Sequence, residues 1–299
     1  MSETLLVTGA SGQLGQRVLH HLVTTLGVPA SRIIATTRKT ATLSDWAAKG
    51  VTVRASDFDD PASLVAAFQG ASRVLLISTD AVGRRVPQHQ AAIDGAVKVG
   101  AQHVVYTSMP RPETSLVTFA PEHAGTEAAL AASALPGWTV LRNNWYFETL
   151  FMSMPSTIAS GKWFTAAGEG RTASIARDDV ARAAAAALAG GERGKVTYTL
   201  TGAKARTNGE IAALVSNAVV KPIAVIPVTV DEFTQGLISH GVPEPMAQLI
   251  ASFDAATAAG QLADVTGDFK KLTGVDPQPL EEWLASTANQ RDLIAGKPH

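Results

Sequence analysis

The fold of this chain is decided near its start, by the stretch Leu5-Leu6-Val7-Thr8-Gly9-Ala10-Ser11-Gly12-Gln13-Leu14-Gly15. A short apolar run ends at Thr8, three glycines follow at three-residue spacing, and an amphipathic segment occupies residues 16–26. This order predicts a strand, a tight turn and a helix. Gly9 can adopt the backbone angles of the turn, Gly12 lets a pyrophosphate approach the backbone, and Gly15 lets the helix pack closely on the strand.

The start of this helix completes a phosphate-binding site. Its first N–H groups are free, and the positive end of the helix dipole points at the turn, so the two together favour an anion. A plain strand-to-helix turn would also account for a glycine triplet, but the clear strand before it and helix after it favour dinucleotide binding. The residues expected to contact the dinucleotide here are Gly9, Ala10, Ser11, Gly12, Gln13, Leu14 and Gly15.

The composition excludes several classes of function. A chain of 299 residues can form one large domain or two closely joined ones. Its formal net charge of −1 provides no basic field for nucleic acid or acidic membranes. Cysteine is absent, which excludes disulfides, thiolate catalysis and cysteine-ligated metals and agrees with a reducing compartment. The seven histidines show no ligand spacing beyond the adjacent His20-His21, so no metal site is expected.

The sequence also carries no sign of export or membrane insertion. The N-terminal residues Met1-Ser2-Glu3-Thr4 lack a basic region and lead directly into a strand, so they do not resemble a signal peptide. No apolar run approaches the ~18 residues that a membrane span needs. We therefore expect a soluble cytoplasmic protein, and a homodimer is compatible with these features.

Strand-like and helix-like segments alternate through the first half of the chain. The expected strands are Leu5–Thr8, Ile33–Thr37, Val51–Ala55, Val74–Ile77, Val104–Thr107 and Thr139–Leu141. The expected helices between them are Gly12–Leu26, Leu43–Lys49, Pro61–Phe68, Val86–Val99 and Glu122–Ala134. Fully apolar strands such as residues 74–77 imply burial on both faces, hence a parallel sheet covered by helices. The pattern predicts a doubly wound α/β fold of the Rossmann type, whose ligands bind beyond the carboxyl ends of the strands.

This alternation changes after Leu141. A helix at Val180–Ala189 and a strand at Lys195–Leu200 return to the main sheet, whereas Ile223–Thr229 is an isolated strand among helical stretches. We therefore expect a dinucleotide-binding Rossmann domain and a smaller, mostly helical α/β domain for the substrate. The first comprises residues 1–144 and about 174–202, and the second about 145–173 and 203–299.

The end of the second strand indicates which dinucleotide binds. NAD-specific sites usually place a carboxylate ~20 residues beyond the glycines, where it binds the ribose 2′-hydroxyl. Here the strand ends Ala35-Thr36-Thr37-Arg38-Lys39, with no carboxylate. Arg38 can bind a 2′-phosphate through two N–H groups and stack over adenine. A solvated basic turn is the alternative, but the position favours NADP(H).

Other residues lie at the same edge of the predicted sheet. Asp57 follows the third strand, where it would either bind the adenine amino group or cap the helix that starts at Pro61. Ser78 and Thr79 end the fourth strand and should lie against the ribose and the nicotinamide half. The pair Arg84-Arg85 is expected in a solvated surface loop.

Several segments in this order resemble one known family. They are Thr8-Gly-Ala-Ser-Gly-Gln-Leu-Gly15, Thr37-Arg38, Leu75-Leu-Ile-Ser-Thr79, Tyr106-Thr-Ser108, Glu122-His123 with Glu127, Leu141-Arg-Asn-Asn-Trp-Tyr146 and Ala166-Ala-Gly-Glu-Gly170. The chain resembles the NmrA-like atypical short-chain dehydrogenases/reductases, most of all the bacterial NADPH:quinone oxidoreductases, with triphenylmethane reductases as close relatives. The resemblance implies NADPH along the glycine turn, Arg38 on its 2′-phosphate, and a substrate pocket between the domains.

The sequence departs from ordinary short-chain dehydrogenases, which use a Tyr-x-x-x-Lys pair to protonate a carbonyl oxygen. The residues four positions after the three tyrosines, Tyr106, Tyr146 and Tyr198, are Pro110, Leu150 and Gly202. No such pair is therefore present. By alignment with the family, Phe119 holds the place of the tyrosine and His123 that of the lysine.

The missing pair restricts the chemistry. Reduction of an ordinary ketone makes an alkoxide, whose basicity is comparable to hydroxide's, with water's pKa near ~16. Such a reaction needs a positioned proton donor, worth roughly 10²–10⁴ in rate. Hydride delivered to a quinone makes a phenolate-like anion, whose conjugate acid has a pKa of ~10. The site therefore suits acceptors that stabilise their own charge, and the protein has to hold the acceptor ring against the nicotinamide.

Four residues are candidates for this pocket, each with an alternative role. His123 would hydrogen-bond the cofactor ribose or the substrate oxygen, or be a helix-surface histidine without function. Asn143 would contact the cofactor or cap a helix. Trp145 and Tyr146 would form an aromatic wall for a flat substrate, or belong to the core between the domains. Phe119 is expected to line the cofactor side.

The leading hypothesis is an NADPH-dependent reductase that transfers hydride directly to quinone-type acceptors without a flavin. A reductase of triphenylmethane or related dyes is one alternative. A non-catalytic NADP(H) sensor is another, because some NmrA-like proteins are of that kind, and a sensor would show an occluded nicotinamide face.

Overall fold

The apolar runs near the N-terminus build one seven-stranded parallel sheet, in the order β3-β2-β1-β4-β5-β6-β9. The computed structural model describes residues 3–296. The strands of this sheet are β1 (Leu5–Val7), β2 (Ile33–Thr37), β3 (Thr52–Ala55), β4 (Arg73–Leu76), β5 (His103–Ser108), β6 (Gly137–Asn143) and β9 (Lys195–Leu200). The strand order reverses between β1 and β4, which is where such sheets bind ligands.

Helices cover both faces of the sheet, so the predicted doubly wound α/β fold is confirmed. Leu5 and Val7 of β1 face one core, and Leu6 between them faces the other, because successive side chains of a strand alternate. The helices of this lobe are α1 (Gln13–His20) with a π-helical continuation (His21–Thr25), α2 (Ser44–Ala48), α3 (Pro61–Phe68), α4 (Arg85–Lys98), α5 (Ala120–Ala132) and α7 (Arg177–Ala189). Short 3-10 turns precede β2 and α2, at Ala30–Arg32 and Thr40–Leu43.

A buried arginine holds the C-terminal end of α7. The side chain of Arg73 is fully buried, and its guanidinium donates to the carbonyls of Ala187, Leu188 and Glu192 at 2.7–3.1 Å. The last carbonyls of a helix have no partner within the helix, and the helix dipole there favours a cation. The buried guanidinium therefore supplies hydrogen-bond donors and a positive charge to the end of α7, and the carbonyls there supply the acceptors that the guanidinium needs.

The second lobe is smaller and mostly helical, as the sequence predicts. Its helices are α6 (Leu150–Ser160), α8 (Asn208–Val219), α9 (Val230–Ser239), α10 (Glu244–Ala258), α12 (Leu280–Ala285) and α13 (Thr287–Ala295), with a 3-10 turn at Phe147–Thr149. Two small sheets pair β7 (Lys162–Thr165) with β11 (Ala224–Pro227) and β8 (Arg171–Thr172) with β10 (Arg206–Thr207). Its separate core includes Phe151, Val215 and Trp283.

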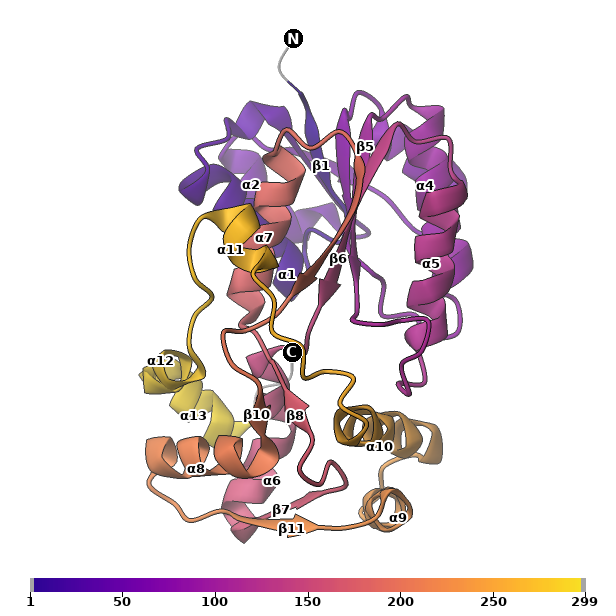
Figure 1. Ribbon diagram of the computed structural model, residues 1–299. Coiled ribbons are helices and arrows are strands. Elements are labelled where there is room, and N and C mark those ends of the chain that lie inside the picture. Colours follow the sequence, from indigo (N-terminus) through magenta and orange to yellow (C-terminus); the bar gives the residue numbers. More distant parts are fainter. Residues whose placement is uncertain (1–2, 297–299) are drawn as a thin grey trace.

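One helix that the sequence assigns to the smaller domain packs on the larger lobe instead. Helix α11 (Asp268–Thr273) belongs to the range assigned to the smaller domain, yet it lies beside α7 of the larger lobe (Figure 1). Phe269 is buried in the core of the larger lobe, and the Asp268 carboxylate accepts a hydrogen bond from the Thr199 amide at 2.8 Å. The chain therefore returns to the first lobe before it ends in the second.

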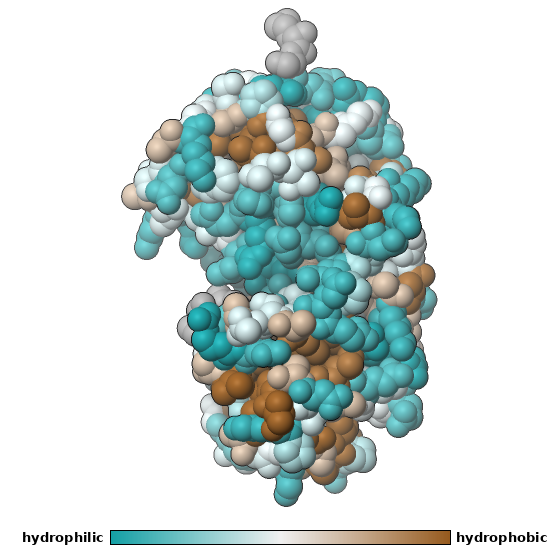
Figure 2. Space-filling view, turned by 90° about the vertical axis from the view of Figure 1, so that its left-hand side faces the viewer, coloured by the Kyte–Doolittle hydropathy of each residue, from teal (hydrophilic) through white to brown (hydrophobic). Residues whose placement is uncertain are grey.

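The two lobes meet at the carboxyl ends of the parallel strands, which point toward the smaller lobe (Figure 1). Asn144 donates to the Leu262 carbonyl at 3.0 Å, and Arg111 forms an ion pair with Asp264 at 2.6 Å. Figure 2 shows a hollow between the lobes on one side of the molecule. The carboxyl ends of the strands therefore lie at the boundary between the lobes, where this hollow is found.

Within residues 3–296, no helix is long and apolar enough to cross a membrane.

Candidate functional site

The glycine turn has the geometry that a phosphate cradle requires. Gly9 has a φ of +58°, and a Cβ on Gly15 would lie 2.4 Å from the Gly9 carbonyl oxygen and 2.7 Å from the Ala10 Cα. The atoms that a Gly15 side chain would hit belong to Gly9 and Ala10 of the turn. Gly15 therefore lets α1 pack closely against the backbone of the turn, and not against strand β1. Gly12 is the N-cap of α1 and supplies no side-chain cap, so the first N–H groups of α1 face the turn without a side-chain partner.

Arg38 lies next to this turn with its charge unpaired. The Ser11 and Thr37 hydroxyls are 2.8 Å apart and tie the glycine turn to the end of β2. Arg38 follows directly and is exposed, and within residues 3–296 its side chain has no hydrogen bond or ion pair. A free guanidinium at this edge suits a 2′-phosphate.

Asp57 does not cap the following helix. Asp60 is the N-cap of α3 and accepts from the amides of Ala62 and Ser63. Among the described residues, the Asp57 carboxylate accepts one hydrogen bond, a local one from the Asp59 amide at 3.0 Å. The capping alternative is therefore wrong, and Asp57 stands at the end of β3 on the same edge as Arg38.

The backbone after β4 is held by side chains from two other elements. The Ser78 amide donates to the Thr107 hydroxyl at 2.9 Å. The Thr79 amide donates to His89 Nε2 at 3.1 Å, and the Thr79 carbonyl accepts from Arg85 Nε at 2.6 Å. Both predicted residues thus lie on a segment at the strand ends that hydrogen bonds to β5 and α4 hold in place.

Asn143 ends β6 with half of its amide unsatisfied. The side chain is buried, and its Nδ2 lies 3.4 Å from Tyr146 Oη. Its Oδ1 is buried and has no hydrogen-bond partner in the described part of the chain. The N-cap position of the next helical turn is Tyr146, so Asn143 does not cap this turn. A buried hydrogen-bond acceptor is normally paired. A hydrogen-bond donor on a bound ligand would supply the partner that the Asn143 Oδ1 lacks.

His123 is buried inside α5, so the alternative of a helix-surface histidine is wrong. Its Nδ1 lies 2.8 Å from Tyr106 Oη, and its Nε2 lies 3.4 Å from Arg85 Nη1. Burial, and secondarily Arg85, lowers the pKa of His123 to about 3. The ring is neutral near pH 7, and a direct hydrogen bond to a ligand would have to release one of its two protein partners.

Arg85 is not in a solvated loop, contrary to the expectation from sequence. It begins α4, and its side chain is 11% exposed, whereas that of Arg84 is 66% exposed and pairs with Asp59 at 3.3 Å. A cation is unfavourable in the first turn of a helix because of the helix dipole. An arginine at a helix start was therefore a signal for a tertiary partner that the sequence reasoning missed.

The aromatic residues separate into two groups. Trp145 packs edge-on against Phe253 of α10 with ring centroids 5.0 Å apart, and Phe119 packs against the same ring at 5.9 Å. Tyr146 instead lies under the Arg177 guanidinium, 5.4 Å from the ring centroid, and belongs to the other core. Trp145 and Tyr146 therefore do not form one aromatic wall. The aromatic cluster instead contains Phe119, Trp145 and Phe253, and Phe253 was not predicted from the sequence.

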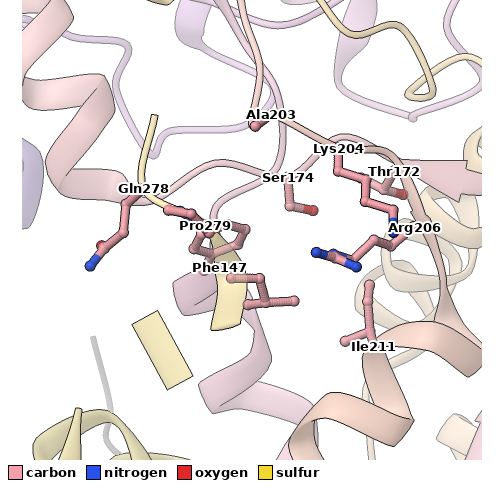
Figure 3. A pocket seen from close by; sticks show the side chains of 10 residues that line it. Phe147, Thr172, Ser174, Ala203, Lys204, Arg206, Ile211, Gln278 and Pro279 are labelled. Carbon is pink, nitrogen blue, oxygen red and sulfur yellow. The ribbon is translucent and has the colours of Figure 1, made fainter. Parts of the chain in front are cut away.

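A pocket in the smaller lobe lies apart from this site. Figure 3 shows it among Phe147, Ser174, Lys204 and Arg206, and none of the predicted site residues lines it. Arg206 is already paired with Glu281 at 2.6 Å. In the chain from residue 3 to residue 296, no group of three or more His, Asp or Glu residues is arranged to hold a metal ion.

Two buried histidines at the site should make stability depend on pH. Burial, and secondarily Arg85, lowers the pKa of His89 to about 4, as it lowers that of His123 to about 3. In the unfolded chain both rings take up a proton near pH 6.5. Between about pH 4 and 6.5 the unfolded state therefore binds more protons, and the free energy of unfolding falls as the pH falls.

Lowering the pH from 7 to 5 is expected to reduce the free energy of unfolding by about 2 kcal/mol for each of these histidines, since one pKa unit is about 1.36 kcal/mol. His103 acts in the same sense, because burial lowers its pKa to about 4. Asp179 acts in the opposite sense, because burial raises its pKa to about 6. Urea unfolding at both pH values checks the prediction. The variant His89→Gln/His123→Gln should lose a large part of the dependence, and the exposed control His240→Gln should keep all of it.

Comparison with known proteins gives one family and several full-length relatives. The model of the NmrA-like family matches residues 1–284. Quinone oxidoreductase 2 of Escherichia coli (strain K12) is 38% identical over 284 residues, which are 95% of this chain and 98% of that protein. The crystal structure of the E. coli NADPH-dependent quinone oxidoreductase complexed with NADPH has a TM-score of 0.89 and 38% identity, covering 94% of this chain and 98% of that one. The Citrobacter sp. triphenylmethane reductase complexed with NADP(H) has a TM-score of 0.86 and 34% identity, covering 94% and 99%.

Proposed function

The chain belongs to the NmrA-like family, and we propose that it is an NADPH-dependent reductase that transfers hydride directly to quinone-type acceptors without a flavin. The observation that carries the proposal is the 38% identity to E. coli quinone oxidoreductase 2 over 98% of that protein's length. The partner is then a small quinone or aromatic molecule rather than a nucleic acid, and the place of action is the cytoplasm.

The edge of the sheet fits an NADPH molecule. When bound, NADPH would supply the hydride. The unpaired Arg38 would bind the 2′-phosphate, the uncapped start of α1 would face the pyrophosphate, and the unsatisfied Asn143 Oδ1 would accept from the nicotinamide half. The residues proposed to hold the cofactor are Gly9, Ala10, Ser11, Gly12, Gln13, Leu14, Gly15, Arg38, Asp57, Ser78, Thr79 and Asn143.

We propose that the acceptor side offers an aromatic surface for a flat ring, and that neither His123 nor Tyr146 acts there as a proton donor. Phe119 and Trp145 share contacts with Phe253, and we propose that this cluster, together with Tyr146 and His123, would orient the acceptor. His123 is neutral, and burial raises the pKa of Tyr146 to about 12. Neither group is an efficient proton donor near pH 7. This supports acceptors whose reduced form is a phenolate-like anion.

A reductase of triphenylmethane dyes is the second candidate. The specific observation in its favour is the 34% identity to the Citrobacter sp. triphenylmethane reductase over 99% of that chain. A cationic dye gains a hydride and becomes neutral, so it too requires no proton from the protein.

The proposal predicts a sharp preference among acceptors. Benzoquinone or naphthoquinone should oxidise NADPH with the protein alone, whereas a simple ketone should be at least ~10²-fold slower, because a positioned acid is worth roughly that factor. Loss of NADPH absorbance measures both, with a triphenylmethane dye in parallel. Fast turnover of the ketone would overturn the mechanism. Tight NADPH binding without turnover of any acceptor would favour the non-catalytic sensor.

A further inference from the structure

Arg85 contacts three groups around the proposed acceptor site. Its Nε donates to the Thr79 carbonyl at 2.6 Å, and its Nη1 lies 3.4 Å from His123 Nε2. Its guanidinium carbon lies 4.8 Å from the centroid of the Phe119 ring. One planar cation thus contacts the backbone after β4 and two rings. These rings, Phe119 and His123, stand where ordinary short-chain dehydrogenases have their tyrosine and lysine.

Glu122 holds the main chain at the start of α4 and lies near the Arg85 guanidinium. Glu122 Oε1 accepts from the Arg85 amide at 3.3 Å and from the Gly83 amide at 2.7 Å. Its other oxygen lies 4.0 Å from Arg85 Nη1 and has no hydrogen-bond partner within residues 3–296. The side chain of Arg85 is 11% exposed. The residues in contact with it or close to it are Thr79, Phe119, Glu122 and His123.

The contact with Arg85 fixes where the proton of His123 lies. A guanidinium only donates hydrogen bonds and keeps its charge in proteins. Nε2 of His123 must therefore be the bare, accepting nitrogen, and Nδ1 must carry the proton and donate it to Tyr106 Oη. The charge of Arg85 also opposes protonation of the ring and contributes to the low pKa of His123.

We propose that Arg85 is a positioning residue of the acceptor site: it holds His123 as the neutral Nδ1–H form and fixes Phe119 and Thr79 around it. This rests on the proposed function, because those residues are taken to surround the acceptor. His123 packs on Phe119 with centroids 5.6 Å apart, so the Phe119 ring is held by Arg85 and His123 together. A lysine keeps the charge but, as a point donor on a flexible stem, cannot make all three contacts.

Histidine NMR tests the proton position without any ligand. In protein labelled with ¹⁵N-histidine, His123 should show a protonated Nδ1 and a bare Nε2 between pH 5 and 8, with the signals assigned through His123→Gln. Its ring faces Arg85, His89 and Tyr106, and Arg85→Gln should raise its pKa because one opposing charge is removed while burial remains. A protonated Nε2 in the wild type would overturn the proposal.

Kinetics test the positioning role. Arg85→Lys should lower kcat/KM for a quinone by roughly tenfold, the effect of losing about one charge-assisted hydrogen bond, and NADPH affinity should change much less. Arg84→Lys is the matched control. Arg84 is the neighbouring residue and its side chain is exposed, so this substitution should leave kcat/KM unchanged. Full kcat/KM in Arg85→Lys would overturn the proposal.

A double-variant cycle separates positioning from mere stability. If Arg85 acts through His123, then Arg85→Gln/His123→Gln should lose little more kcat/KM than Arg85→Gln alone, whereas additive losses would contradict the proposal. If no acceptor is turned over, the proposed function fails, but the NMR result still decides the role of Arg85. If turnover is normal in the Arg85 variants, only the positioning role fails.

Discussion

Gly12→Val is expected to abolish NADPH binding while the protein remains folded. Gly12 has a φ of −75°, which other residues adopt freely, and an added Cβ would lie 3.2 Å from the Gly9 carbonyl oxygen, so the turn has to shift by only a few tenths of an ångström. The valine methyl groups would then occupy the space in which phosphates meet the first N–H groups of α1. At 100 times its dissociation constant, NADPH stabilises the wild type by about 2.7 kcal/mol, and the variant should gain nothing.

Thermal unfolding with and without NADPH measures this difference. Gly191→Ala is a matched control, because a Cβ there meets no atom within 4 Å. Gly15→Ala should behave differently, since its Cβ would lie 2.4 Å from one backbone atom of the turn, and the protein should lose stability even without ligand. A Gly12→Val protein that NADPH stabilises as well as the wild type would contradict our location of the phosphates.

Arg38→Ala is expected to weaken NADPH binding by roughly 10- to 100-fold and to leave NADH binding nearly unchanged. A charge-assisted hydrogen bond contributes ~1.5–3 kcal/mol, and ~1.4 kcal/mol is tenfold in affinity. Arg38 is exposed and has no ion pair within the described residues, so its removal breaks no contact of the fold.

Titration of both nucleotides by calorimetry checks the prediction, with Lys39→Ala as the control. Lys39 is also exposed and adjacent, so a merely solvated basic turn would give two similar and small effects. A wild-type protein that binds NADH as tightly as NADPH would exclude the assignment of Arg38 to the 2′-phosphate.

Much of the fold could be predicted because its signals are local. Each strand of the seven-stranded sheet lies within two residues of its predicted bounds at either end. Alternating burial, as between Leu5 and Leu6, depends only on the pleat of the strand. Gly50, Gly70 and Gly100 end helical segments with positive φ angles, a conformation that favours glycine whatever surrounds it.

The sequence by itself determined the strands, the glycine turn and the presence of an arginine directly after β2, because each depends on a few consecutive residues. Tertiary structure alone decided which residues surround the proposed acceptor site. Phe253 joins Phe119 and Trp145 only because α10 packs across the strand ends. Arg84 and Arg85 are adjacent residues of the same type, yet one is solvated and the other is enclosed by segments on either side of it in the chain. Whether a charge is buried depends on what packs over it, and that is a property of the assembled fold.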